Sequence, residues 1–124
     1  MKMIYTDKAP KPLGAYSQAV EHNNTLYISG QLPIDPIDTE KMITDVKEQT
    51  RQTLANLEAI LIAAGSSKEK VLKVTIYITD IAIWGDVNTV YGEFFGGHKP
   101  ARAAVPVKDL PKGYQIEIEA VAFI

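Results

Sequence analysis

The sequence contains no cysteine and only two histidines, so several kinds of site are excluded or disfavoured. Without a thiol, the chain forms neither disulfides nor thiolate metal sites, and it has no cysteine nucleophile. His22 and His98 stand far apart and show neither HxH nor HxxxH spacing. Because a zinc centre needs several such ligands close together, we expect no metal site.

Long hydrophobic runs are also absent. No apolar run approaches the roughly 20 residues that are needed to span a bilayer. The first residues, MKMIYTD, lack the apolar core of a signal peptide. We therefore expect a cytoplasmic protein with no membrane partner.

Neither sign of charge dominates, since 13 basic and 15 acidic side chains give a formal net charge of −2. Nucleic-acid-binding proteins usually carry a clustered basic face, so the composition does not support a nucleic-acid partner. The 124 residues include 46% hydrophobic and 23% charged side chains, which is typical of a folded protein. This length fits a single domain, residues 1–124, that can bury a core.

Hydrophobic periodicity predicts an α+β domain. Two segments repeat apolar residues at helical spacing, 46–64 and 83–95, with Asp45 as a capping residue before the first and glycines after both. Short apolar or alternating runs that end at proline, glycine or asparagine predict strands. The expected strands are 2–5, 16–20, 25–29, 71–79, 100–105 and 116–124, with one hairpin through an Asn-rich turn at 21–24 and a closing hairpin formed by the last two strands.

This order of elements predicts a mixed sheet of about six strands with two helices packed on one face. The other face would be uncovered, although it carries apolar positions such as Val121 and Phe123. Monomers rarely leave such a surface in water, so we expect oligomerisation through this face.

The candidate functional residues lie in the last quarter of the chain. Arg102 has only small neighbours in the run PARAAV at 100–105, where a buried guanidinium is costly unless an anion meets it. From the residues alone, two alternatives stay open. Arg102 forms a structural ion pair with Glu117 or Glu119 across the predicted hairpin, or it waits in a roomy pocket for a ligand carboxylate, bound bidentately.

Glu117 and Glu119 are two residues apart on a predicted strand, so both side chains point to one face, roughly 6–7 Å apart. Such a pair is compatible with glycosidase chemistry, but nothing in the sequence indicates a groove that stacks sugars. One carboxylate beside an arginine-bound substrate can instead position water or relay a proton. Asn88 is a polar amide on the apolar stripe predicted for the second helix, which calls for an explanation.

Five blocks in collinear order, spread over essentially the whole chain, together resemble the RidA (YjgF-type) family of reactive intermediate deaminases. They are GAYSQ at 14–18, ISGQLP at 28–33, DVN at 86–88 with Tyr91 and the FF pair at 94–95, PARA at 100–103, and IEIEA at 116–120. The resemblance implies a chorismate-mutase-like fold and a homotrimer with three clefts between subunits. It also implies a 2-iminobutanoate/2-iminopropanoate deaminase, which hydrolyses 2-imino or enamine acids to 2-keto acids and ammonia without a cofactor.

The same resemblance implies roles for individual residues. Arg102 matches the arginine that grips the substrate carboxylate, with help from backbone N–H groups beside it. Glu119 matches the residue that holds the attacking water or assists proton transfer, whereas Glu117 is interpreted as a solvated or interfacial charge. The residues expected to line the substrate pocket are Tyr16, Ser29, Gly30, Asn88 and Ala103.

Three features depart from the pattern of many relatives. Ala15 replaces a proline, Ala104 replaces a cysteine, and the link at 96–99 is short. A mechanism that needs a thiol is therefore ruled out. Two alternatives to a deaminase are a module that binds keto acids or amino acids without turnover, and an endoribonuclease or translation inhibitor. The acidic balance and the lack of a histidine pair argue against the second of these.

Overall fold

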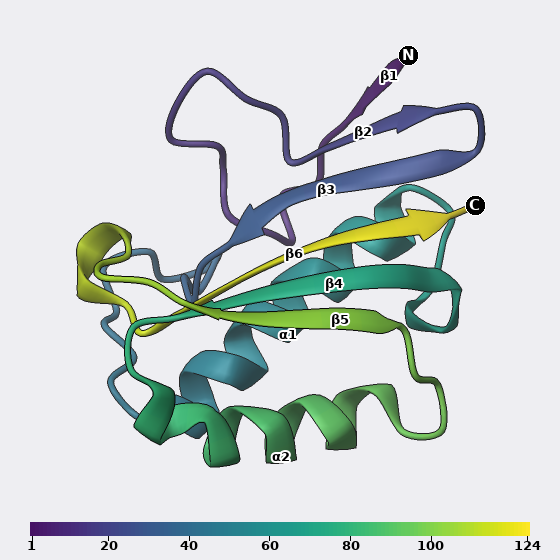
Figure 1. Ribbon diagram of the computed structural model, residues 1–124. Coiled ribbons are helices and arrows are strands. Elements are labelled where there is room, and N and C mark those ends of the chain that lie inside the picture. The colour runs from purple at the N-terminus through teal and green to yellow at the C-terminus, as the bar shows by residue number, and fades with distance from the viewer.

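Six strands and two α-helices follow one another along the chain in the computed structural model, which describes all 124 residues. The strands are β1 (Lys2–Ile4), β2 (Ala19–His22), β3 (Thr25–Gln31), β4 (Val71–Ile78), β5 (Ala101–Pro106) and β6 (Ile116–Phe123), and the helices are α1 (Val46–Ala63) and α2 (Trp84–Phe95). Both helices pack on one face of the sheet (Figure 1), so the expected α+β architecture is confirmed. Neither helix is both long and apolar enough to cross a membrane.

The sheet has the strand order β1-β2-β3-β6-β4-β5. β6 lies between β3 and β4 and is antiparallel to both, whereas β5 is parallel to β4. The predicted closing hairpin is therefore wrong, because β4 separates β5 from β6. The parallel pair needs a long crossover connection, and α2 supplies it.

The predicted first hairpin is confirmed, but its first strand, predicted at 16–20, lies at 19–22, so two residues of the turn predicted at 21–24 belong to the strand. β2 begins at Ala19, so Tyr16 lies in the loop before it. Asn23 and Asn24 form the turn with φ angles of 51° and 59°, as a type I′ turn requires. Such turns match the twist of paired strands, and asparagine tolerates positive φ better than most residues, so the turn chemistry favours the observed pairing.

The first helix begins and ends where its capping residues predict. The carboxylate of Asp45 accepts a 3.0 Å hydrogen bond from the backbone N–H of Glu48. After the helix, Gly65 has a φ of 79°, which favours glycine in this position. Apolar side chains of α1 then meet the sheet, and Leu57 and Ile60 are fully buried.

Side chains alternate strictly along β6, and this alternation decides which residues face away from the helices. Between the buried positions lie Glu117, Glu119 and Val121, all partly exposed. Two aromatic side chains of the sheet are also exposed: the exposed fraction is 53% for Tyr27 and 43% for Phe123. The face of the sheet that points away from the helices, here called the open face, is covered by no helix (Figure 1). The loop between β1 and β2 lies at one end of this face. The positions of β6 buried under the helices are Ile116, Ile118, Ala120 and Ala122.

The loop between β1 and β2 is tied down by one buried amide. Gln18, which is 1% exposed, accepts a 2.7 Å hydrogen bond from the N–H of Thr6. Its Nε2 donates to the carbonyl oxygens of Thr6 and Pro10, both at 2.9 Å. Several backbone groups of the loop thus depend on a single side chain, and Ala9 is held at 2% exposure.

Replacing Gln18 by leucine should release this loop. The substitution leaves at least two backbone groups without partners, at a cost of about 1–3 kcal/mol each. We expect a lower urea midpoint and faster trypsin cleavage after Lys8, whose neighbour Ala9 is buried in the folded chain. Unchanged stability and unchanged cleavage in the variant would show that the loop is held by other contacts.

Two buried threonines of α1 provide a matched pair for a second test. Both are 0% exposed, but the hydroxyl of Thr53 has no hydrogen-bond partner, whereas that of Thr50 donates to the carbonyl of Val46 at 2.8 Å. We expect Thr53→Val to raise the unfolding free energy by about 1 kcal/mol, because it removes a buried, unpaired hydroxyl. Thr50→Val should lower it by about 1 kcal/mol. Urea denaturation measures both, and equal losses in the two variants would contradict this account.

Candidate active site

Arg102 lies on the edge strand β5, and its side chain turns toward α2. The guanidinium carbon lies 4.9 Å from the ring centroid of Trp84 and 4.8 Å from that of Tyr91. Its Nη1 donates a 2.8 Å hydrogen bond to the Oδ1 of Asn88. Two aromatic faces and one amide therefore hold the cation, and its other donors have no partner within the chain.

A hollow of about 420 Å³, here called the Arg102 hollow, opens beside this guanidinium. His98 and Lys99 also line it, so three of its side chains are basic. The Nε2 of His98 lies 2.7 Å from the carbonyl oxygen of Val71, so this nitrogen donates a hydrogen. A hollow with basic side chains and free guanidinium donors suits an anionic ligand. Its lining residues are Asn88, Tyr91, Gly92, Phe95, Gly96, His98, Lys99, Pro100 and Arg102.

Asn88 is exposed, so its predicted place on the buried stripe of α2 is wrong. The stripe runs through Val87, Val90 and Tyr91 instead. One residue advances a helix by about 100°, so position 88 is turned away from the stripe toward the edge of the sheet. There its amide meets Arg102, which explains a polar residue at this position.

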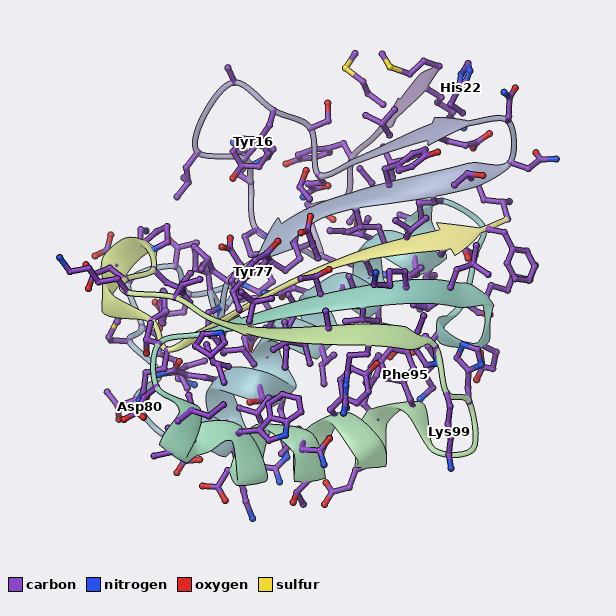
Figure 2. All side chains as sticks on the ribbon, viewed as in Figure 1. Tyr16, His22, Tyr77, Asp80, Phe95 and Lys99 are labelled. Carbon is purple, nitrogen blue, oxygen red and sulfur yellow. The ribbon has the colours of Figure 1, made fainter.

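Glu119 lies on the open face of the sheet and accepts a hydrogen bond from the hydroxyl of Tyr77 on β4. Figure 2 shows Tyr77 on the side of the sheet away from α2, whereas Phe95 lies between the sheet and α2. The hydrogen bond to Glu119, followed by burial, raises the pKa of Tyr77. The phenol therefore stays protonated and remains a donor to the Glu119 carboxylate.

Opposite Glu119, strand β3 contains a β-bulge. The register with β6 slips by one residue between Ile28 and Gln31, which leaves Ser29 and Gly30 at the irregularity. The hydroxyl of Ser29 donates a 2.6 Å hydrogen bond to the carbonyl of Ser17. This contact ties the loop that carries Tyr16 to the bulge, and bulges often redirect side chains beside functional sites.

Glu117 packs against the same bulge. A Cβ atom added to Gly30 would lie 2.7 Å from the Oε2 of Glu117, so the missing side chain makes room for this carboxyl group. Burial, followed by the charge of Glu119, raises the pKa of Glu117. The chain provides Glu117 with no hydrogen-bond donor and no ion-pair partner.

The two glutamates and the bulge residues line a second hollow of about 580 Å³, here called the Glu119 hollow. It brings together four predicted site residues, Tyr16, Ser29, Gly30 and Glu119, and adds Glu117 to them. The sequence offered one signal for Glu117, which is its spacing of two residues from Glu119 on the same strand. It offered none for Pro111, because Pro111 lies in a turn, where hydrophobic periodicity gives no information. The full lining is Leu13, Gly14, Tyr16, Ser29, Gly30, Leu32, Pro111, Glu117 and Glu119.

Within one chain, the predicted site residues form two separate groups. Arg102 and Asn88 lie on the helix side, whereas Glu119 lies on the open side two strands away. The chain contains no ion pair between Arg102 and either glutamate; its one salt bridge is elsewhere, on α1. Ala103 is half-buried opposite Thr75 on β4 and lines neither hollow.

Comparisons with known proteins show which family this chain resembles. A family model described as Endoribonuclease L-PSP matches residues 6–124. A RutC family protein of Pyrococcus horikoshii is 52% identical over 122 residues, covering 98% of this chain and 97% of that protein. A 2-iminobutanoate/2-iminopropanoate deaminase of Rattus norvegicus is 48% identical over 121 residues, covering 98% and 88%.

A solved structure leads to the same family. The crystal structure of RidA from the Antarctic bacterium Psychrobacter sp. PAMC 21119 has a TM-score of 0.96 and 43% identity, and the match covers 100% of both chains. The fold and the sequence therefore agree over the same residues. The chain belongs to the endoribonuclease L-PSP family, which is also known as the YjgF/RidA family.

Proposed function

We propose that this protein hydrolyses 2-imino and enamine acids, such as 2-iminopropanoate and 2-iminobutanoate, to 2-keto acids and ammonia. The observation that supports this most directly is the state of Arg102, whose guanidinium is held by aromatic rings and one amide and faces no carboxylate of its own chain. Such an arginine is prepared for an anionic substrate. The rat relative that is named as a deaminase of this class is 48% identical over 121 residues.

Arg102 would bind the carboxylate of the imino acid. One guanidinium nitrogen bonds to Asn88, and the remaining N–H groups can form a planar, bidentate pair with a carboxylate. β5 is an edge strand, so one row of its backbone groups pairs with no strand of the same chain. Backbone N–H groups near Ala103 would add donors beside the clamp.

Glu119 would act on the water. Its side chain accepts a hydrogen bond from the hydroxyl of Tyr77, which holds it in place, and a carboxylate so held can orient a water molecule and take its proton. Tyr16, Ser29 and Gly30 would line the space around the substrate. Imines hydrolyse readily, so orientation by the clamp and one activated water are sufficient without a nucleophilic side chain.

A homotrimer with clefts between subunits would unite the two groups. Arg102 and Glu119 lie on opposite sides of the sheet, so the arginine of one copy would face the carboxylate of another. The open face supplies apolar surface for such an assembly, including Tyr27, Val121 and Phe123. A surface of this kind favours association in water.

Sedimentation tests the assembly. We expect a mass of three times the 13.7 kDa chain. Tyr27→Asp should weaken association because it places a charge on the open face. Ile62→Asp should not, because Ile62, 65% exposed, lies on α1, which covers the opposite face of the sheet. A wild-type mass near 13.7 kDa would reject both the trimer and the site between subunits.

An imine generated in place by an amino-acid oxidase tests the activity. The protein should accelerate release of keto acid and ammonia, and Arg102→Ala should lower kcat/KM by about 100-fold or more, because losing a charged, bidentate contact costs about 3 kcal/mol. Arg51→Ala is the matched control, since Arg51 lies on α1 and pairs with Glu48. Full activity of Arg102→Ala would refute the clamp.

The same preparations separate the two alternatives. Saturable binding of 2-ketobutyrate with no acceleration over buffer would favour a module that senses keto acids or amino acids. RNA cleavage that survives Arg102→Ala would favour the endoribonuclease that the family description names. The histidines give that alternative no support, because His98 is bonded to a backbone carbonyl and His22 lies at the end of β2.

A further inference from the structure

Lys99 lines the Arg102 hollow, but the proposed function gives it no role. It lies in the link that joins α2 to β5, and Figure 2 shows its side chain on the helix side of the sheet. The ammonium group of Lys99 forms no hydrogen bond, ion pair or cation–π contact within the chain, whereas Lys68 and Lys70 each lie over an aromatic ring. The hollow therefore contains a second cation with no partner besides Arg102.

The link that carries Lys99 has a defined course. Gly96 ends α2 with a φ of 60°, a conformation that favours glycine. The next turn is held by His98, whose backbone N–H donates to the carbonyl of Phe95 at 3.2 Å. The imidazole Nε2 of His98 donates to the carbonyl of Val71 at 2.7 Å. A short link that is held at these points keeps the backbone of Lys99 beside the hollow.

The two hollows differ in charge. The Arg102 hollow is lined by Arg102, Lys99 and His98 and by no aspartate or glutamate. The Glu119 hollow is lined by two glutamates and by no lysine, arginine or histidine. A substrate with a second negative charge would be repelled by the glutamates and attracted toward Lys99. The charges thus favour one direction for an acidic side chain of the substrate.

We propose that Lys99 is a specificity-determining residue, which makes the protein prefer imino acids that carry a second carboxylate. Such substrates are the imines of four- and five-carbon dicarboxylic amino acids. This inference rests on the proposed function and names a substrate class for the same site. Arg102 would bind the carboxylate beside the C=N bond, and Lys99 the carboxylate at the far end. Water adds to the C=N bond and ammonia leaves as before, and the second carboxylate does not react.

The size and direction of the hollow agree with this class. The hollow extends along α2 from Asn88, which bonds to Arg102, to Gly96 and the link, a rise of about 12 Å along the helix. At about 30 Å³ for each non-hydrogen atom, as for liquid water, 2-iminopropanoate would fill about 180 Å³. That is less than half of the 420 Å³ in the hollow. A five-carbon dicarboxylic imino acid would fill about 300 Å³ and extend toward Lys99.

The test compares 2-iminoglutarate with 2-iminopentanoate, which has the same five carbons but only one carboxylate. Each imine is generated in place by an oxidase that accepts the parent amino acid. We expect the wild type to have the higher kcat/KM for 2-iminoglutarate. Lys99→Gln should lower the ratio of the two kcat/KM values by about fivefold, the upper end for an exposed charge pair. Lys99→Glu should lower it by about 25-fold, because repulsion of similar size replaces attraction.

Two further variants make the result specific. Lys99→Arg should keep the preference, because it keeps the charge. Lys41→Gln is the matched control, since Lys41 is also an exposed lysine in a loop and does not line the hollow. It should keep the wild-type ratio. Because salt screens exposed charges, the wild-type ratio should approach that of Lys99→Gln as ionic strength rises from about 0.05 M to about 0.5 M.

Several outcomes would overturn the inference. Equal losses of kcat/KM for both imines in Lys99→Gln would do so, because Lys99 would then serve the carboxylate that both substrates share. A wild type with no preference for 2-iminoglutarate, or an unchanged ratio in Lys99→Gln, would do so too. These results leave the proposed function standing as long as the wild type hydrolyses 2-iminopropanoate and Arg102→Ala does not. A wild type that hydrolyses no imine would instead overturn the proposed function, and the role of Lys99 with it.

Discussion

The register of β6 is the constraint on which the rest of the structure depends. β6 pairs with two strands at once, and its alternate residues Ile118 and Ala120 are buried under the helices. Burial of these positions forces Glu117 and Glu119 to the open face. A slip of one residue would put both carboxyl groups into the apolar core, at a prohibitive cost in desolvation. The same interactions that stabilise the core therefore aim the two carboxyl groups.

Buried amides extend this control to the loops. Gln18 holds the loop that carries Tyr16, and Asn56 on α1 donates to the carbonyl oxygens of Leu32 and Ile34. Irregular segments cannot satisfy their own backbone groups when they pack against a core, so a side chain with both donor and acceptor must do so. Loops held in this way can line a hollow with little loss of order on binding. The site thus combines a rigid sheet with tethered loops.

Local sequence patterns predicted much of this fold, whereas the pairing of distant strands was not predicted. The caps of α1 and the alternation along β4 and β6 depend on residues close in sequence, so both helices and the core faces were predictable. The insertion of β6 between β3 and β4 depends on contacts between distant segments, and a false hairpin resulted. The prediction for Asn88 was wrong because it placed the residue on the buried stripe of α2, about 100° around the helix from its observed direction. Resemblance to a family supplied the roles expected for Arg102 and Glu119, which spacing alone left open.

The separation of Arg102 from the glutamates has a chemical consequence. Were they neighbours in one chain, the guanidinium would pair with a carboxylate, stabilise its charged form and lose its own free donors. With the sheet between them, Arg102 rests on Trp84 and Tyr91 and keeps its donors for a ligand. In the proposed assembly the substrate carboxylate reaches that arginine first, so Glu119 stays free for water. Within one chain, division of these residues between the two faces of the sheet thus keeps the guanidinium from pairing with either glutamate.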